Sequence, residues 1–301
     1  MGVALLTLGL FASTSASAAE NPSPAAATNS PTVSVTPRYR VAVCDWMILK
    51  RQKPGAFPLA KELGAEGVEV DMGSLGQRET FENQLTNAAA CQAFRERARE
   101  NGLEIPSLAM SGFYGQSFAE RPTVPRMIQD CVETMQRLNV KIAFLPLGVS
   151  CDLTKKPELR PAVIERLKTV GKVAEKAGVI IGMETSLPAA EEVKLLDEVG
   201  SPAIKIYFNF ANAVKNGRDI PTELRTLARE RLCQIHATNE DGVWLQNDPK
   251  LDLPKIKRTL DELGWSGWLV IERSRDAKDP RNVKKNFSAN VAHLKAVFQG
   301  N

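Results

Sequence analysis

Four side chains that carry oxygen or nitrogen each follow an apolar run of the sequence: Glu184, Asn209, His236 and Glu272. They are separated by 25, 27 and 36 residues, and each interval is long enough for a helix and the next strand. A polar group at the edge of a dry interior needs a partner, and carboxylate, amide and imidazole groups can share a divalent cation. The four positions therefore predict a metal centre built from successive strand ends.

Histidine usage limits the kind of centre. The chain contains only two histidines, His236 and His293, which excludes sites built from several imidazoles, such as a three-histidine zinc centre. We interpret His293, which lies in an amphipathic run near the C-terminus, as a structural residue.

The elements that must position these groups are eight short β-rich runs. Several are almost continuously apolar, as expected for parallel strands covered on both faces. The predicted strands span Arg40–Cys44, Gly67–Met72, Glu104–Ala109, Lys141–Pro146, Val179–Glu184, Ile204–Asn209, Leu232–His236 and Trp268–Glu272.

Longer runs with apolar residues at helical spacing lie between the strands, and glycines follow several of them, as they do at helix ends. The clearest predicted helices span Pro125–Leu138, Pro161–Lys176, Glu191–Val199, Pro254–Leu263 and Asn282–Phe298.

Eight such units predict an α/β fold, a (β/α)8 TIM barrel forming a single domain over residues 38–301. An open doubly wound sheet is the alternative, but no glycine-rich phosphate turn follows Cys44. Because catalytic groups of such barrels lie at the C-terminal ends of strands, the four residues named first are expected on one rim.

The N-terminal region has a different character. Residues 1–18 contain a short apolar run followed by Ala16-Ser17-Ala18 and are predicted to be a signal peptide, whereas residues 19–37, rich in Pro, Ser, Thr and Ala, are predicted to be a disordered linker. We therefore expect export to the periplasm. No other apolar stretch is long enough to cross a membrane.

Composition excludes further classes. The 301 residues include 39 Lys+Arg and 35 Asp+Glu, for a formal net charge of +4, and 43% are hydrophobic. These values fit a globular protein and lack the strong positive charge that is typical of nucleic-acid-binding domains. None of the five cysteines forms a CxxC pair, and we interpret Cys44 and Cys233 as small core residues. A Cys131–Cys151 disulfide and the oligomeric state are left open.

Several stretches carry a family resemblance: Gly182–Thr185, Ile206–Asn212, Ile235–Asn239 and Gly267–Glu272, with Gly67–Asp71 nearer the N-terminus. From Arg38 onward the chain resembles the xylose-isomerase-like TIM-barrel superfamily, and within it the sugar phosphate isomerase/epimerase branch. The resemblance implies one divalent metal (Mn, Mg, Co or Zn) held by Glu184, Asn209, His236 and Glu272.

The resemblance also assigns Glu184 and Glu272 as the catalytic acid and base. Two departures lower the metal affinity that we expect: Asn209 stands where the family has Asp, and Thr238-Asn239 stands where it has Lys-Asp. An amide oxygen can bind a hard cation, but it brings no charge.

The implied reaction is proton abstraction next to a sugar carbonyl, giving an isomerase or epimerase that acts through an enediolate. A lyase or dehydratase acting on a keto-sugar, and a carbohydrate-binding barrel that has lost catalysis, are the alternatives. For an exported protein we expect an unphosphorylated sugar or sugar derivative. Residues near other strand ends are candidates to bind it: Trp46, Glu69, Asp71, Tyr114, Asn239 and Trp244.

Overall fold

The computed structural model describes residues 9–10, 12–13 and 37–300. The predicted signal peptide and linker therefore lie almost entirely outside the described residues. Residues 37–301 form a unit of their own, which contains every strand and helix named below.

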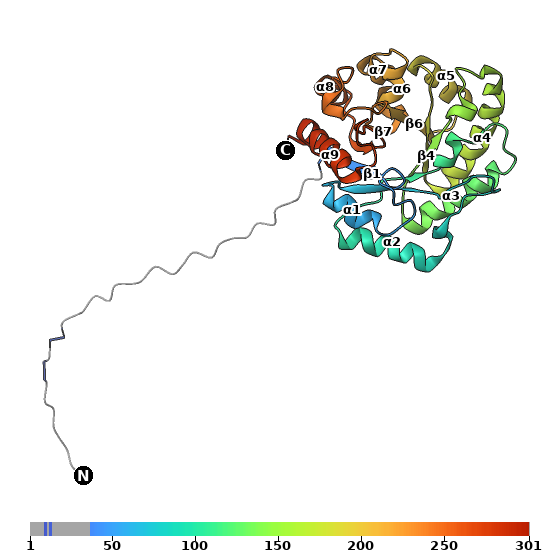
Figure 1. Ribbon diagram of the computed structural model, residues 1–301. Coiled ribbons are helices and arrows are strands. Elements are labelled where there is room, and N and C mark those ends of the chain that lie inside the picture. The colour runs from blue at the N-terminus through green and yellow to red at the C-terminus, as the bar shows by residue number, and fades with distance from the viewer. Residues whose placement is uncertain (1–8, 11, 14–36, 301) are drawn as a thin grey trace, which may run out of the picture. The chain divides into compact units, whose positions relative to one another are not determined.

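Eight parallel strands, paired in sequence order, close into a barrel (Figure 1), which confirms the predicted TIM-barrel fold. The first strand pairs with the second and with the eighth, which closes the sheet. The strands are β1 (Tyr39–Cys44), β2 (Gly67–Asp71), β3 (Leu108–Ala109), β4 (Ile142–Pro146), β5 (Ile180–Glu184), β6 (Ile204–Asn209), β7 (Leu232–His236) and β8 (Gly267–Ile271).

Strand β3 differs most from its predicted length. The expected run began at Glu104, but only Leu108 and Ala109 form a regular strand, and Glu104 makes an isolated bridge to Gly67. Pro106 lies within this run and lacks a backbone N–H, so it cannot donate to a sheet ladder. The carbonyls of Glu104 and Ser107 still accept hydrogen bonds from β2, so the barrel wall stays closed here.

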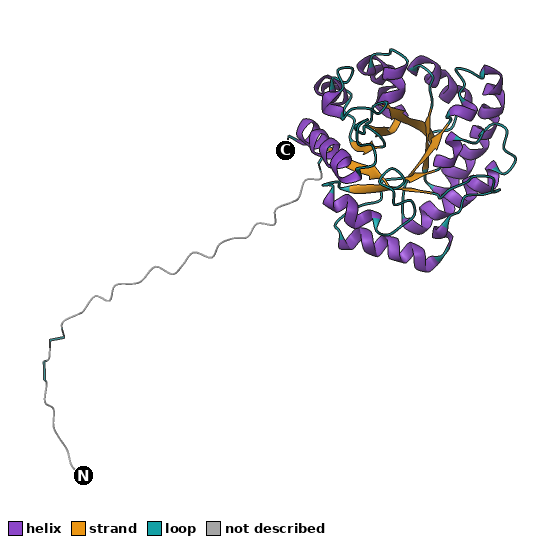
Figure 2. Ribbon diagram, viewed as in Figure 1, coloured by secondary structure: helices purple, strands orange, loops and turns teal. Residues whose placement is uncertain are grey.

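Helices surround the strands as an outer ring (Figure 2). All five clearest predicted helices are present, and Gly178 ends α4 with a left-handed backbone (φ +66°) that favours glycine. The helices are α1 (Ala56–Glu62), α2 (Ala88–Glu100), α3 (Val124–Leu138), α4 (Arg160–Ala177), α5 (Ala189–Val199), α6 (Phe210–Lys215), α7 (Ile220–Arg231), α8 (Leu253–Glu262) and α9 (Val283–Gln299).

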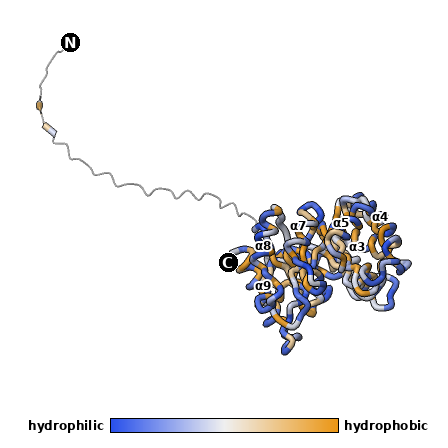
Figure 3. Tube along the Cα trace, turned by 90° about the horizontal axis from the view of Figure 1, so that it is seen from above, coloured by the Kyte–Doolittle hydropathy of each residue, from blue (hydrophilic) through white to orange (hydrophobic). Residues whose placement is uncertain are grey.

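Two apolar clusters hold the strands. Val41 and Val43 of β1 belong to the larger cluster, which also contains the apolar faces of the helices. The alternating residues Ala42 and Cys44 belong to a smaller cluster inside the barrel, together with Phe144 and Tyr207. The hydropathy colouring shows apolar and polar residues interspersed along the helices (Figure 3). Among the described residues, no helix is both long and apolar enough to cross a membrane.

Candidate active site

The four residues at the strand ends gather on one rim, as the barrel topology requires. Glu184, Asn209 and His236 are the last residues of β5, β6 and β7, and Glu272 directly follows β8. Asn209 and His236 are register partners in neighbouring strands. All four side chains are buried, and His236 is fully inaccessible to solvent.

Three of these side chains make direct contact. Oε2 of Glu184 lies 2.9 Å from Nδ1 of His236 and accepts a hydrogen bond of 2.8 Å from the amide nitrogen of Asn209. Oδ1 of Asn209 accepts from the backbone N–H of Ala211 and caps α6. Asn209 therefore turns its donor group toward Glu184 and its oxygen toward the backbone, so in this arrangement it does not offer a ligand oxygen.

Tyr114, a predicted substrate-binding residue, joins the two glutamates. It lies in a 3₁₀ turn after β3, and its hydroxyl contacts Oε1 of Glu184 at 3.1 Å and Oε1 of Glu272 at 3.0 Å. A hydroxyl carries one hydrogen, so it donates to one carboxylate at a time. Arg273 Nε lies 3.8 Å from Oε2 of Glu272. The two carboxylates, one at the end of β5 and one directly after β8, thus face a shared hydroxyl.

Burial and these neighbours shift the pKa values. Burial by itself opposes the imidazolium, but the carboxylates of Glu69 and Glu184 outweigh it and raise the pKa of His236 to about 10. Burial, followed by the charges of Glu184 and Glu272, raises the pKa of Tyr114 well above its ordinary value. Burial also raises the pKa of Glu272, and the charge of His236 offsets part of this increase. The rim therefore combines a phenol that keeps its proton with a carboxyl group, Glu272, whose pKa is raised.

A cavity of about 220 Å³ opens above these groups. Its wall is polar and carries both charge signs, which suits a small polyhydroxylated ligand more than a lipid or an aromatic compound. The lining residues are Tyr114, Leu147, Gly148, Val149, Asp152, Lys155, Glu184, Thr185, Ser186, Asn209, Ala211, Asn212, Lys215, Glu240, Glu272 and Arg273.

The other predicted substrate-binding residues do not line this cavity. Trp46 packs against the apolar cluster inside the barrel. Asp71 accepts hydrogen bonds from the backbone of Gly73 and Ser111, so its carboxylate holds two loops together. Burial raises the pKa of Asp71 to about 6 against the opposing charge of Arg51.

The remaining two candidates build loops. Asn239 donates to the carbonyl of Val243 and accepts from the N–H of Asp241 within the segment after β7. Trp244 donates its ring N–H to Asn286 on α9 at 2.8 Å. Neither residue is among those that line the cavity.

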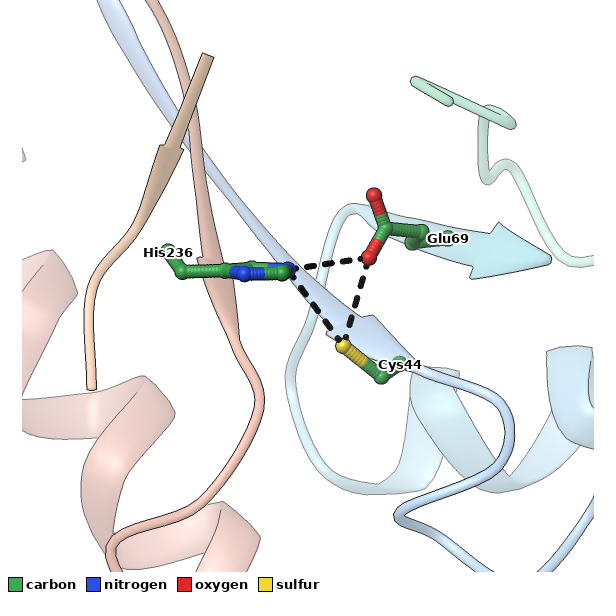
Figure 4. A group of neighbouring side chains, drawn as sticks. All are labelled: Cys44, Glu69 and His236. Carbon is green, nitrogen blue, oxygen red and sulfur yellow. Dashed lines mark hydrogen bonds and ion pairs between the residues drawn. The ribbon is translucent and has the colours of Figure 1, made fainter. Parts of the chain in front are cut away.

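A group deeper in the barrel was not anticipated. Among the described residues, one set of three His, Cys, Asp or Glu side chains has its ligand atoms within 4.8 Å of one another: Cys44, Glu69 and His236, all fully buried (Figure 4). Burial and the charges of Glu69 and Glu272 raise the pKa of the Cys44 thiol well above its ordinary value, which keeps the proton on sulfur.

Strand periodicity carried a signal for this group. In β2, Glu69 alternates with Val68 and Val70, which belong to the larger apolar cluster. Because side chains alternate along a strand, Glu69 points into the barrel. The sequence named Glu69 as a residue near a strand end, whereas the structure buries it beneath the rim and 3.0 Å from Nε2 of His236.

The fold and site together define a (β/α)8 barrel with carboxylate and imidazole groups at the C-terminal ends of its strands. The model of the xylose isomerase-like TIM barrel family matches residues 57–297, and the chain belongs to that family.

One curated relative is 2-epi-5-epi-valiolone 7-phosphate 2-epimerase of an Actinoplanes species. It is 26% identical over 194 residues, which are 62% of this chain and 68% of the relative. Among solved structures, a sugar phosphate isomerase/epimerase from Parabacteroides distasonis has a TM-score of 0.67 at 16% identity and covers 90% of this chain and 98% of its own.

The structure of 3-keto-D-glucoside 4-epimerase from E. coli has a TM-score of 0.66 at 16% identity, covering 86% of this chain and 99% of its own. At these identities the structural likeness establishes a shared fold.

Proposed function

We propose that this protein is a divalent-metal-dependent sugar isomerase or epimerase that moves a proton next to a carbonyl group. The observation that carries the proposal is the pair of buried carboxylates, Glu184 and Glu272, that face one hydroxyl at the floor of a polar cavity. Two carboxylates on different strands can reach a substrate carbon from two directions, which is the geometry needed to remove and return a proton.

The residues present fit a divalent ion. Glu184, His236 and Glu272 would hold it, and two carboxylates with one imidazole suit Mn, Mg, Co or Zn. Asn209 would join them only after its amide turns away from Ala211. When bound, such an ion polarises the substrate carbonyl and stabilises the enediolate that forms when the neighbouring C–H loses its proton.

The side chains supply the proton transfers. We assign Glu184 and Glu272 as the base and the acid. In an epimerisation one takes a proton and the other delivers one to the opposite face, so their protonation states are exchanged and proton exchange with solvent restores them before the next turnover. In an isomerisation the glutamate that took the proton returns it to the neighbouring carbon. Tyr114 stays protonated and donates to whichever carboxylate is ionised. The epimerases among the relatives support this reaction class, and the polar cavity supports a sugar or sugar derivative as substrate.

A second candidate function is a barrel that binds carbohydrate without catalysis. The observation that favours it is that both polar atoms of the Asn209 side chain are already hydrogen-bonded. Its oxygen caps α6, and its nitrogen donates to Glu184.

The deciding experiment combines metal content with proton exchange. The protein is equilibrated with Mn²⁺, freed of unbound ion and analysed, and it is then incubated with a panel of unphosphorylated and phosphorylated ketoses and aldoses in D₂O. One ion per chain, together with deuterium incorporation that the Glu184→Gln variant lacks, is the expected result. Sugar binding with neither bound metal nor exchange would overturn the proposal in favour of the non-catalytic barrel.

A further inference from the structure

A buried carboxylate lies directly beneath His236, on the side away from the cavity. Oε1 of Glu69 is 3.0 Å from Nε2 of His236 and 3.4 Å from Sγ of Cys44. Figure 4 shows how the three side chains face one another. Oε2 of Glu69 accepts hydrogen bonds of 2.5 Å from Ser107 and 2.6 Å from Tyr207. Both oxygens of this carboxylate therefore act as acceptors, and the whole group is sealed from solvent.

A further buried residue fixes the direction of these hydrogen bonds. The side-chain nitrogen of Gln234 donates to the hydroxyl oxygens of both Ser107 and Tyr207 at 2.7 Å. Because each hydroxyl oxygen accepts from Gln234, its own hydrogen is left for Glu69. The layer beneath the rim thus directs the hydroxyl donors of Ser107 and Tyr207 at Glu69.

The consequence falls on the imidazole of His236. A carboxylate oxygen that only accepts requires a hydrogen on Nε2, and a histidine with a hydrogen on Nε2 can offer a lone pair only from Nδ1. Nδ1 is the nitrogen that faces Glu184 and the rim. The rings of Phe144 and Tyr207, with centroids 4.6 and 4.5 Å from that of His236, keep the imidazole from turning over.

We infer that Glu69 is a positioning residue that orients His236, so that Nδ1 is presented to the ion of the proposed function, on which this inference rests. Carboxylates that hold the second nitrogen of a metal-binding histidine fix its tautomer and raise its basicity, and their loss typically lowers metal affinity about 10- to 100-fold.

The three neighbouring groups could instead hold an ion among themselves. An ion bound by Cys44, Glu69 and His236 would need the hydrogens now on sulfur and on Nε2 to leave, in a space with no access to solvent. It would also use the nitrogen that points away from Glu184. The observed hydrogen bonds favour the positioning role. Removing the Cys44 thiol should leave the metal affinity unchanged if Glu69 positions His236, and should abolish metal binding if the ion lies among these three groups.

The test compares Mn²⁺ affinity, measured by calorimetric titration, in matched variants. Glu69→Gln keeps the shape of the side chain and should weaken Mn²⁺ binding about 10- to 100-fold. Cys44→Ala should leave the affinity unchanged. Glu66→Gln, the same substitution at the residue directly before β2, should also bind Mn²⁺ as the wild type does. If Glu69→Gln does not fold, Ser107→Ala removes one donor to Glu69 and should weaken binding by a smaller factor.

A second readout needs no metal. Because the chain has only two histidines, ¹⁵N labelling of histidine gives signals from His236 and His293 alone. Because the pKa of His236 is raised to about 10, the metal-free wild type should show hydrogens on both ring nitrogens near neutral pH, and the one on Nε2 should be protected from exchange. Glu69→Gln should move or remove this Nε2 signal while His293 stays unchanged. A purely structural role for Glu69 would lower the unfolding temperature without changing the Nε2 signal of His236.

The outcomes separate the inference from the function on which it rests. Unchanged Mn²⁺ affinity in Glu69→Gln, with wild-type binding intact, would overturn the inference and leave the proposed function standing. Loss of metal in Cys44→Ala, with a thiolate-to-cobalt charge-transfer band after Co²⁺ substitution of the wild type, would place the ion in the deeper group and overturn it as well. A wild type that binds no metal would overturn both.

Discussion

The amide nitrogen of Asn209 lies 2.8 Å from Oε2 of Glu184, the same oxygen that Nδ1 of His236 approaches to 2.9 Å. Asn209 therefore neutralises part of the charge of Glu184 with a hydrogen-bond donor. An aspartate at this position would face Glu184 with a like charge at the same distance, which is unfavourable unless a cation lies between them.

Asn209→Asp should therefore destabilise the metal-free protein and strengthen the stabilisation that a bound metal provides. In EDTA, the loss of a hydrogen bond to a charged group and the new repulsion should reduce the free energy of unfolding by about 1–3 kcal/mol. In Mn²⁺, the additional carboxylate should bind the ion more tightly and increase the stabilisation that the metal provides. Thermal unfolding with and without Mn²⁺ measures both effects, and Asn212→Asp, in the same cavity wall, is the control. A metal-induced shift no larger than in the wild type would argue against a cation at this rim.

Removing either carboxylate of the acid–base pair should stop turnover without disturbing the fold. For Glu184→Gln and Glu272→Gln we expect exchange of substrate hydrogen with D₂O to slow by about 10²- to 10⁴-fold. The far-ultraviolet circular dichroism should stay unchanged. Glu240→Gln, which also lines the cavity, should retain most of the activity. Equal losses in all three variants would mean that cavity charge, rather than proton transfer, is being measured.

The contribution of the Tyr114 hydroxyl to kcat/KM should be the same at neutral and at mildly alkaline pH. Tyr114→Phe removes the shared contact to Glu184 and Glu272, and a hydrogen bond to a charged group contributes about 1.5–3 kcal/mol, so kcat/KM should fall roughly 10- to 100-fold. Because burial and both glutamates raise the pKa of Tyr114 well above its ordinary value, the wild-type to variant ratio should be constant from about pH 6 to 9. A ratio that approaches one as pH rises would mean that the phenol ionises in this range.

Glu192 should make the protein less stable as pH rises. It is buried on α5 and accepts a hydrogen bond of 2.7 Å from Thr185. Burial, against the opposing hydrogen bond from Thr185, raises the pKa of Glu192 to about 8 from an ordinary value of 4.5. Between these two values the unfolded chain has released the proton while the folded protein still holds it. The free energy of unfolding therefore falls as pH rises through this interval and levels off above about pH 8.

Glu192→Gln keeps an acceptor for Thr185 and removes the titration. Its unfolding temperature should match that of the wild type near pH 5 and exceed it near pH 8.5, as measured by a series of thermal melts. Glu191→Gln, at the partly exposed neighbouring residue on the same helix, should show no such divergence. Parallel curves for Glu192→Gln and the wild type would mean that Glu192 is ionised in the folded protein throughout.

The sequence by itself determined the barrel fold and which residues lie at the C-terminal ends of its strands. Alternating strand and helix patterns are local properties, and a closed parallel sheet brings all strand ends of one direction together, so Glu184, Asn209, His236 and Glu272 had to share a rim. The pattern predicted β3 least well, because Pro106 interrupts an otherwise strand-like run.

Only the tertiary structure decided how these residues meet. The orientation of the Asn209 amide depends on the backbone of α6, and the role of Glu69 depends on His236, which lies 167 residues further along the chain. Asp71 and Trp46 also lie near strand ends, yet loop amides and the barrel interior surround them instead of the cavity. A residue type and its strand position follow from local pattern, whereas its hydrogen-bond partner is set by whichever distant side chain fills the neighbouring space.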